Sequence, residues 1–198
     1  MMCEPRPYHH GDLRRALIGA ARQLLEEVGA DDLSLRAVAR EAGVSPAAPY
    51  HHFKDKGDLL AAVAEQGFEM LAEDISLAVA ASTPGSERMV SIGSAYVMFA
   101  HHNRALYRIM AGSARTRDRP AGEAETRVAE MILAGVATTR PGVPEDDLAL
   151  ACAGVWATMH GLADMMTFKV MEPFKIQFDS EQAFVRAVLT RLGAEPTR

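Results

Sequence analysis

The stretch that decides the fold covers residues 33–56 and reads LSLRAVAREAGVSPAAPYHHFKDK. Its first part predicts a short helix over 35–42, with Ser34 as the capping residue and Gly43 as the stop. Ser45 can cap a second helix directly after the turn, because a glycine accepts the left-handed backbone that a tight turn requires. This order predicts two short helices that cross at a steep angle, a helix-turn-helix whose second helix fits the major groove of DNA.

The second of these helices is expected to be short or distorted. Pro46 stands at its first position, where a missing N–H does no harm, but Pro49 at the fourth position removes one backbone hydrogen bond. Residues 46–50 also lack Arg, Asn and Gln, the side chains that bind purines with two hydrogen bonds. We therefore expect base recognition from small apolar contacts to thymine methyl groups, from Tyr50 and His51, and from DNA shape.

Helical periodicity extends over the chain on both sides of this stretch. Apolar residues recur at intervals of three and four from Asp12 to the stop at Gly29, and again from the cap Asp55 to the break at Ser82. No stretch shows sustained alternation at period two, so no sheet is expected. The predicted fold class is all-α with about nine helices, and the remaining ones lie over 86–101, 103–112, 121–138, 145–171 and 180–192.

The charge balance permits nucleic acid as a partner. The formal net charge is −5, yet residues 1–56 hold eight basic and eight acidic side chains, and the deficit belongs entirely to 57–198. Because surface placement rather than net charge decides affinity for DNA, the N-terminal part can still present a positive face.

Composition favours a cytoplasmic protein. Its two cysteines cannot form a disulfide framework, and residues 1–11 contain no apolar run that resembles a secretion signal. The apolar segment 148–166 contains His160 and Asp164, so it predicts a buried or interface helix rather than a membrane span. We expect no membrane partner.

Residues 46–60 strongly resemble the tetracycline-repressor (TetR) family of bacterial transcription regulators. In that family a helix-turn-helix ends in a Tyr, then a His-Phe, then a Lys that begins a long helix. The resemblance extends upstream through 33–36 and back to 9–13, although the family usually has an aliphatic residue where this chain has Pro49.

A second resemblance lies far from the first. Trp156, His160 and Gly161 look like the Trp-His-Gly signature of one subgroup of TetR-like ligand domains. The resemblance implies a helix-turn-helix DNA-binding domain over 1–56 and a helical ligand-binding and dimerisation domain over 57–198. It also implies a homodimeric repressor that binds a palindromic operator in double-stranded DNA and is released by a small, largely apolar inducer, without a cofactor.

The candidate DNA contacts combine resemblance with side-chain chemistry. By resemblance, Tyr50, His51 and Lys56 match family positions that contact the backbone of DNA. Other basic side chains can supply charge, and residues at helix starts lie beside free N–H groups that attract phosphate. The residues that we expect to contact DNA are Ser34, Arg36, Ser45, Ala47, Ala48, Tyr50, His51, Lys54 and Lys56.

The candidate ligand site lies in the later helices. Methionine and aromatic residues there exceed what one narrow apolar stripe requires, and methionine adapts its shape to varied apolar ligands. Such residues at helical spacing also form ordinary core, and the resemblance favours a cavity. The residues that we expect to line it are Met98, Phe99, Tyr107, Met110, Met131, Trp156, Met159, His160 and Asp164, with Tyr107, His160 and Asp164 as the polar groups that orient a ligand.

The dimer interface is expected in the last two long helices. By resemblance, the helices over 145–171 and 180–192 form a four-helix bundle with those of a second subunit. A separate argument agrees, because the run 148–155 is apolar on most sides and rich in small residues, and such a helix needs a partner to cover it.

Two other functions compete with this interpretation. His160 and Asp164 lie one turn apart and could serve an all-α enzyme as an acid–base pair, or the chain could bind a small molecule without DNA. Neither a Ser or Cys nucleophile motif nor a glycine-rich phosphate loop accompanies the pair, so we expect no enzyme activity. Three His-His pairs suggest a metal, but adjacent helical residues point about 100° apart, so no metal site is expected.

Overall fold

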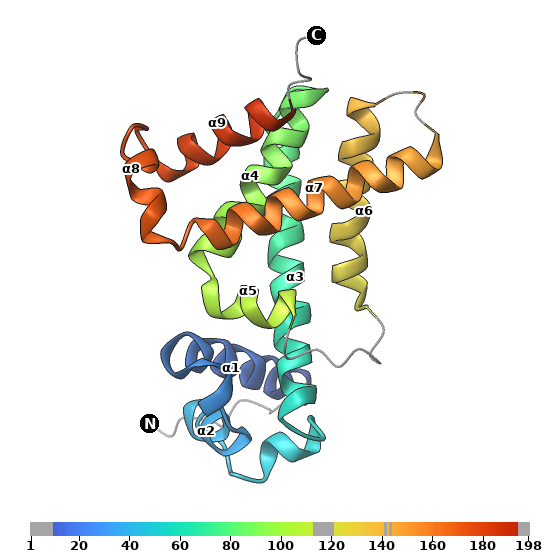
Figure 1. The fold of residues 1–198 in the computed structure, drawn as a ribbon. Coiled ribbons are helices and arrows are strands. Elements are labelled where there is room, and N and C mark those ends of the chain that lie inside the picture. The colour runs from blue at the N-terminus through green and yellow to red at the C-terminus, as the bar shows by residue number, and fades with distance from the viewer. Residues whose placement is uncertain (1–9, 113–120, 141, 143, 194–198) are drawn as a thin grey trace, which may run out of the picture. The chain divides into compact units, whose positions relative to one another are not determined.

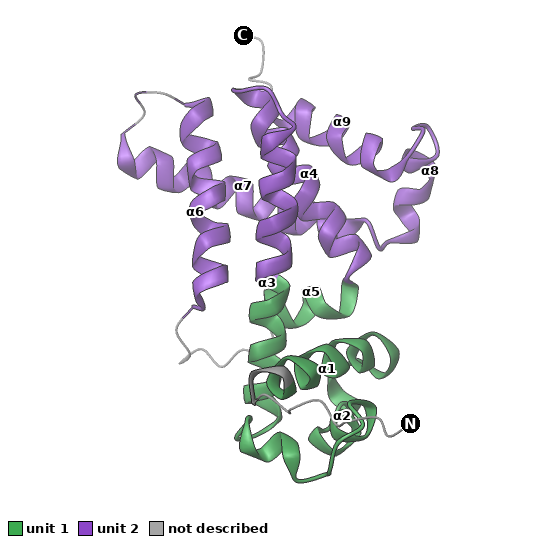
Figure 2. Ribbon diagram, turned by 180° about the vertical axis from the view of Figure 1, so that it is seen from behind, with its two compact units in different colours: residues 1–67, 104–120 green, residues 68–103, 121–198 purple. Residues whose placement is uncertain are grey.

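The computed structural model describes residues 10–112, 121–140, 142 and 144–193 (Figure 1). Within these ranges the regular elements are nine α-helices and two short 3₁₀ helices. This confirms the predicted all-α fold. The chain divides into two compact units (Figure 2), formed by residues 1–67 with 104–120 and by residues 68–103 with 121–198.

Unit 1 contains α1 (His10–Asp32), α2 (Leu35–Glu41), the 3₁₀ helix η1 (Ala48–His51), the start of α3 (Lys56–Ala80) and α5 (Arg104–Ala111). Helix α1 packs against α2 and against α5, and α2 packs against η1 (Figure 2). The core between these elements is apolar and almost fully buried, and it includes Leu17, Ala21, Val38, Phe53 and Leu59. Helix α1 breaks at Gly29, which has a left-handed backbone (φ 77°), as the sequence predicted.

Unit 2 contains the rest of α3 with α4 (Ser86–His102), α6 (Glu123–Thr139), α7 (Glu145–Met165), η2 (Lys169–Met171), α8 (Glu172–Lys175) and α9 (Glu181–Gly193). Helix α4 packs against α6, α7 and α9 (Figure 1). The residues that fill this core are apolar and include Val97, Val128, Ile132, Met159 and Val185. The predicted helices over 86–101, 103–112, 121–138 and 180–192 all lie within two residues of the observed ones.

The helix predicted over 145–171 was too long, because α7 ends at Met165. The hydroxyl of Thr167 donates to the carbonyl of Asp164 at 2.7 Å, which gives a carbonyl at the helix end a side-chain partner. Phe168 then takes an extended backbone (φ −87°, ψ 130°), and the chain continues through η2 and α8. Of the segment 145–171, α7 is therefore the part that forms the first of the two candidate dimer helices.

Helix α7 is apolar but poorly covered by its own chain. By length and composition it is the one helix among the described residues that could cross a membrane, a test that core helices of water-soluble proteins also pass. Only 17% of its most apolar window is buried inside this single chain. Its exposed apolar residues, which include Leu150, Ala153 and Ala157, are therefore available to a partner.

A buried ammonium group connects three elements of unit 2. The Lys175 side chain is 8% exposed, and its Nζ donates to Glu172 (2.6 Å) and to Glu181 (2.9 Å). The second carboxylate oxygen of Glu181 lies 2.7 Å from His101 Nε2 at the end of α4. The hydrogen bonds with Glu172 and Glu181 raise the pKa of Lys175, and the bond from Lys175 lowers the pKa of Glu181 against the opposing effect of burial.

We expect Glu181→Gln to reduce the acid sensitivity of the fold. The pKa of Glu181 is lower in the folded chain than in the unfolded chain, where a Glu has a pKa of about 4.3. The ionised carboxylate therefore adds to the free energy of unfolding above that pH, and this stabilisation is lost as the pH falls through the folded pKa. The carboxylate is 37% exposed, so the expected contribution is about 1 kcal/mol or less. Chemical denaturation from neutral pH downward should show a shallower loss of stability in E181Q than in the native chain, and Asp179→Asn, at an exposed neighbour, should behave like the native chain.

Candidate functional site

The turn between α2 and η1 has the geometry that the sequence predicts. Ser34 caps α2, since its Oγ accepts a hydrogen bond from the Ala37 N–H at 3.2 Å. At the C-terminal end of α2, Val44 N donates to the Ala39 carbonyl at 2.9 Å, and Gly43 N donates to the Arg40 carbonyl at 3.1 Å. Gly43 has φ 68°, which a residue with a side chain rarely adopts. This pattern ends α2 and redirects the chain into the second element of the helix-turn-helix.

The second element is a 3₁₀ helix, as short as Pro49 led us to expect. Hydrogen bonds three residues apart run from Ala48 N to the Ser45 carbonyl (3.0 Å) and from Tyr50 N to the Ala47 carbonyl (3.1 Å). Proline has no N–H to form the four-residue bond of an α-helix at this point, so the tighter pattern results. The predicted capping role of Ser45 is wrong, because η1 begins at Ala48 and its N-cap is Ala47.

Residues 46–51, here called the recognition segment, combine one buried residue with several exposed ones. Pro49 is buried. Ala47, Tyr50 and His51 are exposed, Tyr50 at 54%, and Ala48 is half-buried. The segment therefore presents the side chains of Ala47, Tyr50 and His51 to solvent.

The start of α3 is fixed by two reciprocal hydrogen bonds. Asp58 N donates to Asp55 Oδ1 at 2.8 Å, which confirms Asp55 as the cap, and Lys54 N donates to Asp58 Oδ2 at 3.1 Å. Lys56 Nζ donates to the backbone carbonyl of Asp31, at the end of α1, at 2.7 Å. These bonds hold the chain directly after the recognition segment in one conformation.

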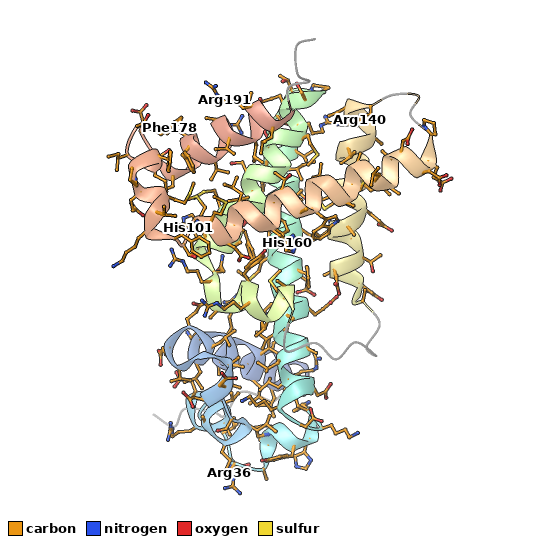
Figure 3. All side chains as sticks on the ribbon, in the orientation of Figure 1. Arg36, His101, Arg140, His160, Phe178 and Arg191 are labelled. Carbon is orange, nitrogen blue, oxygen red and sulfur yellow. The ribbon has the colours of Figure 1, made fainter. Side chains whose placement is uncertain are left out.

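All nine candidate DNA contacts lie in unit 1. Arg36, on α2, projects away from the ribbon of that unit (Figure 3). Lys54 is exposed after the recognition segment, whereas Lys56 is half-buried. The other candidates lie at the start of α2, in the turn and in the recognition segment, and they are Ser34, Ser45, Ala47, Ala48, Tyr50 and His51. Cationic, hydroxyl and small apolar groups thus occur together on the helix-turn-helix and the residues next to it.

The candidate ligand residues divide between the units. Tyr107 and Met110, on α5, belong to unit 1. The seven in unit 2 are Met98 and Phe99 on α4, Met131 on α6, and Trp156, Met159, His160 and Asp164 on α7.

An aromatic cluster in unit 2 links α4 to α7. The ring of Tyr96 lies 5.9 Å from that of Trp156 and 5.4 Å from that of His160. His160 Nδ1 lies 3.0 Å from the Trp156 carbonyl, which can only accept, so Nδ1 carries the proton. His160 Nε2 lies 3.1 Å from the Tyr96 hydroxyl, within hydrogen-bond distance. The cluster orients the His160 ring between α4 and α7.

Comparison with known proteins decides the family. The family model described as "Bacterial regulatory proteins, tetR family" matches residues 17–63. The model described as "Tetracyclin repressor-like, C-terminal domain" matches residues 89–192, which is more than half of the chain. The chain belongs to the tetR family. The two matches contain the helix-turn-helix and the helices of unit 2 from within α4 to within α9. The narrower subgroup suggested by Trp156, His160 and Gly161 stays a prediction.

Solved structures agree with the family. A protein of unknown function from Rhodococcus sp. RHA1 is 30% identical, covers 96% of this chain and 97% of its own, and has a TM-score of 0.77. A possible TetR family transcriptional regulator from Streptomyces coelicolor A3(2) is 24% identical over 91% of this chain and 89% of its own, with a TM-score of 0.61. A TetR variant from Acinetobacter baumannii AYE in complex with minocycline is 25% identical over 94% and 92%, with a TM-score of 0.59. No curated protein matches the chain.

Within this tetR family member, the structure gives His160 partners that the sequence did not indicate. Its ring nitrogens are engaged by Tyr96 and the Trp156 carbonyl, and Asp164, one turn further along, is exposed. Roles for His160 and Asp164 in orienting a ligand stay a prediction. Tyr96 was not among the polar groups expected to orient a ligand, although its place three residues before Phe99 puts it on a face with a predicted ligand contact.

Proposed function

We propose that this tetR family regulator is a repressor that binds a palindromic operator as a homodimer in the cytoplasm and is released by a small, largely apolar inducer. Family membership makes the chain a DNA-binding regulator. The observation that carries the proposal is the recognition segment, in which Pro49 is buried while Ala47, Tyr50 and His51 are exposed. Repression, the operator symmetry and the inducer are the parts that experiment must test.

The side chains in and around the recognition segment support two kinds of contact with DNA, one to bases and one to phosphates. Ala47 and Ala48 are small enough to contact thymine methyl groups, and Tyr50 and His51 extend beyond them. We propose that exposed cations around the segment bind phosphates, with Lys54 among them. Because the segment contains no Arg, Asn or Gln, part of the specificity is expected to come from the shape of the duplex.

The exposed face of α7 supports a homodimer. Leu150 is 73% exposed, and Ala153, Ala157 and Gly161 follow it at helical spacing on the same exposed face. A Cβ atom added at Gly161 would meet no atom within 4 Å, so this chain leaves the face open. We propose that α7 and α9 pack against the same helices of a second subunit. A palindromic operator would require the two recognition segments of that dimer to lie about 34 Å apart.

The inducer is proposed to act through linkage. A ligand that prefers a dimer unable to match successive major grooves lowers DNA affinity by the ratio of its affinities for the two forms. A shift from 1:99 to 99:1 requires about 5.5 kcal/mol of differential binding. Helix α3 contributes residues 56–67 to unit 1 and 68–80 to unit 2, so we propose that it carries the change. The minocycline complex of the A. baumannii relative supports a small-molecule inducer for this chain as well.

The proposal is tested by selecting bound sequences from random duplex DNA at about 50–100 mM salt. We expect an enriched palindrome whose half-sites lie about one helical turn apart. A screen of small apolar and aromatic compounds should then identify molecules that release the protein from that duplex. Failure to enrich any sequence would overturn the DNA-binding function, and enrichment of a single asymmetric half-site would overturn the proposed dimer.

A further inference from the structure

The side-chain ammonium group of Lys56, next to the recognition segment, is hydrogen-bonded to another part of the same chain. Lys56 is half-buried, and its ammonium group donates to the Asp31 carbonyl at 2.7 Å. Asp31 lies in the short turn of α1 that follows the break at Gly29. Carbonyl groups at a helix end lack an N–H partner within the helix, so this bond satisfies a group that otherwise needs water. Lys54, two residues earlier, is exposed in contrast.

The bond joins α1 to the chain that carries the recognition segment. Between His51 and Lys56 the chain has little freedom, because Phe53 is 2% exposed and Asp55 caps α3. Helix α1 makes a second contact here, since the guanidinium carbon of Arg14 lies 5.4 Å from the centre of the Phe53 ring. Helix α1 therefore contacts the chain after the recognition segment at two places. Arg14, near the start of α1, contacts Phe53, and Asp31, near its end, contacts Lys56.

We propose that Lys56 is a positioning residue, which sets operator specificity by holding the recognition segment against α1 and does not bind a phosphate itself. The inference rests on the proposed DNA-binding function. Moving the ammonium to a phosphate would remove the partner of the Asp31 carbonyl and release the start of α3 from α1. A shifted recognition segment loses contacts to base edges, which depend on exact placement, more than it loses general attraction to the backbone of DNA.

The test compares Lys56→Met with Lys54→Met on two probes, the duplex enriched from random DNA and a scrambled duplex of equal length. Each phosphate contact contributes about 0.9 to the slope of log affinity against log salt, so one contact per subunit contributes about 1.8 per dimer. We expect K54M to lower the slope by about that amount and to weaken both duplexes alike. We expect K56M to keep the native slope and to weaken the enriched duplex at least about tenfold, with the scrambled duplex unchanged.

Two further variants separate positioning from loss of the fold. Lys56→Arg keeps a charged donor and should restore preference for the enriched duplex. Lys56→Gln keeps an uncharged N–H donor, so it should retain the native slope and more specificity than K56M. All affinities are measured below the onset of thermal unfolding of each variant, so a loss of stability is not read as a loss of binding.

The outcomes that overturn the inference differ from those that overturn the function. If K56M and K56Q lower the salt slope as K54M does, Lys56 binds phosphate and the inference fails. It also fails if K56M binds both duplexes as the native chain does. If the native chain enriches no duplex at all, the DNA-binding function fails instead.

Discussion

Ala47→Glu should abolish operator binding while leaving the fold and the dimer intact. Ala47 is exposed in the recognition segment, so a longer side chain meets no protein core. A carboxylate there would enter the groove of a polyanion without a partner. At about 2 kcal/mol per half-site, the two subunits together lose about 4 kcal/mol, or roughly a thousandfold in affinity.

The matched control is Ala111→Glu, at the end of α5. It adds the same charge to unit 1 at an exposed alanine that lies outside the helix-turn-helix. Affinity for the enriched duplex is measured by fluorescence anisotropy, and circular dichroism checks that both variants are folded. Native-like binding by A47E would remove the recognition segment from the DNA interface. An equal loss in A111E would assign the effect to net charge instead.

Ala157→Arg should convert the dimer into monomers and thereby remove operator binding. Ala157 lies near the centre of the exposed face of α7, between Ala153 and Gly161. A two-fold interface carries every substitution twice, and an unpaired buried charge costs several kcal/mol. We expect the dimer dissociation constant to rise at least about a thousandfold. Sedimentation velocity over a range of protein concentrations measures it directly.

Ala134→Arg provides the comparison for this variant. It places the same side chain on an exposed position of α6, in the same unit, and should leave the dimer unchanged. A dimeric A157R that still binds the enriched duplex would contradict the proposed interface on α7. Dissociation of both variants would show that α6 also contacts the second subunit.

Local signals predicted most helix ends correctly. Gly29 and Gly43 both have positive φ, and Ser34 and Asp55 both accept the capping hydrogen bonds expected of them. Each of these features depends on residues within four positions, which is the range that a sequence pattern reports. The short recognition segment was predicted for the same reason, because the consequence of a missing N–H at Pro49 is local.

Some features that the sequence did not predict depend on partners far along the chain. Glu181, at the start of α9, contacts His101 on α4. His160 contacts Tyr96, 64 positions away. Periodicity places residues on a helical face, but it does not say which other helix that face meets.

The prolines of the recognition segment also bear on the heat of association with DNA. Pro46 and Pro49 have fixed φ angles, and Pro49 is already buried, so we expect the segment to need little ordering when it docks. Calorimetry over a range of temperatures should therefore give a heat-capacity change that matches the contact area alone. The larger negative values typical of chains that fold on their target are not expected for this regulator.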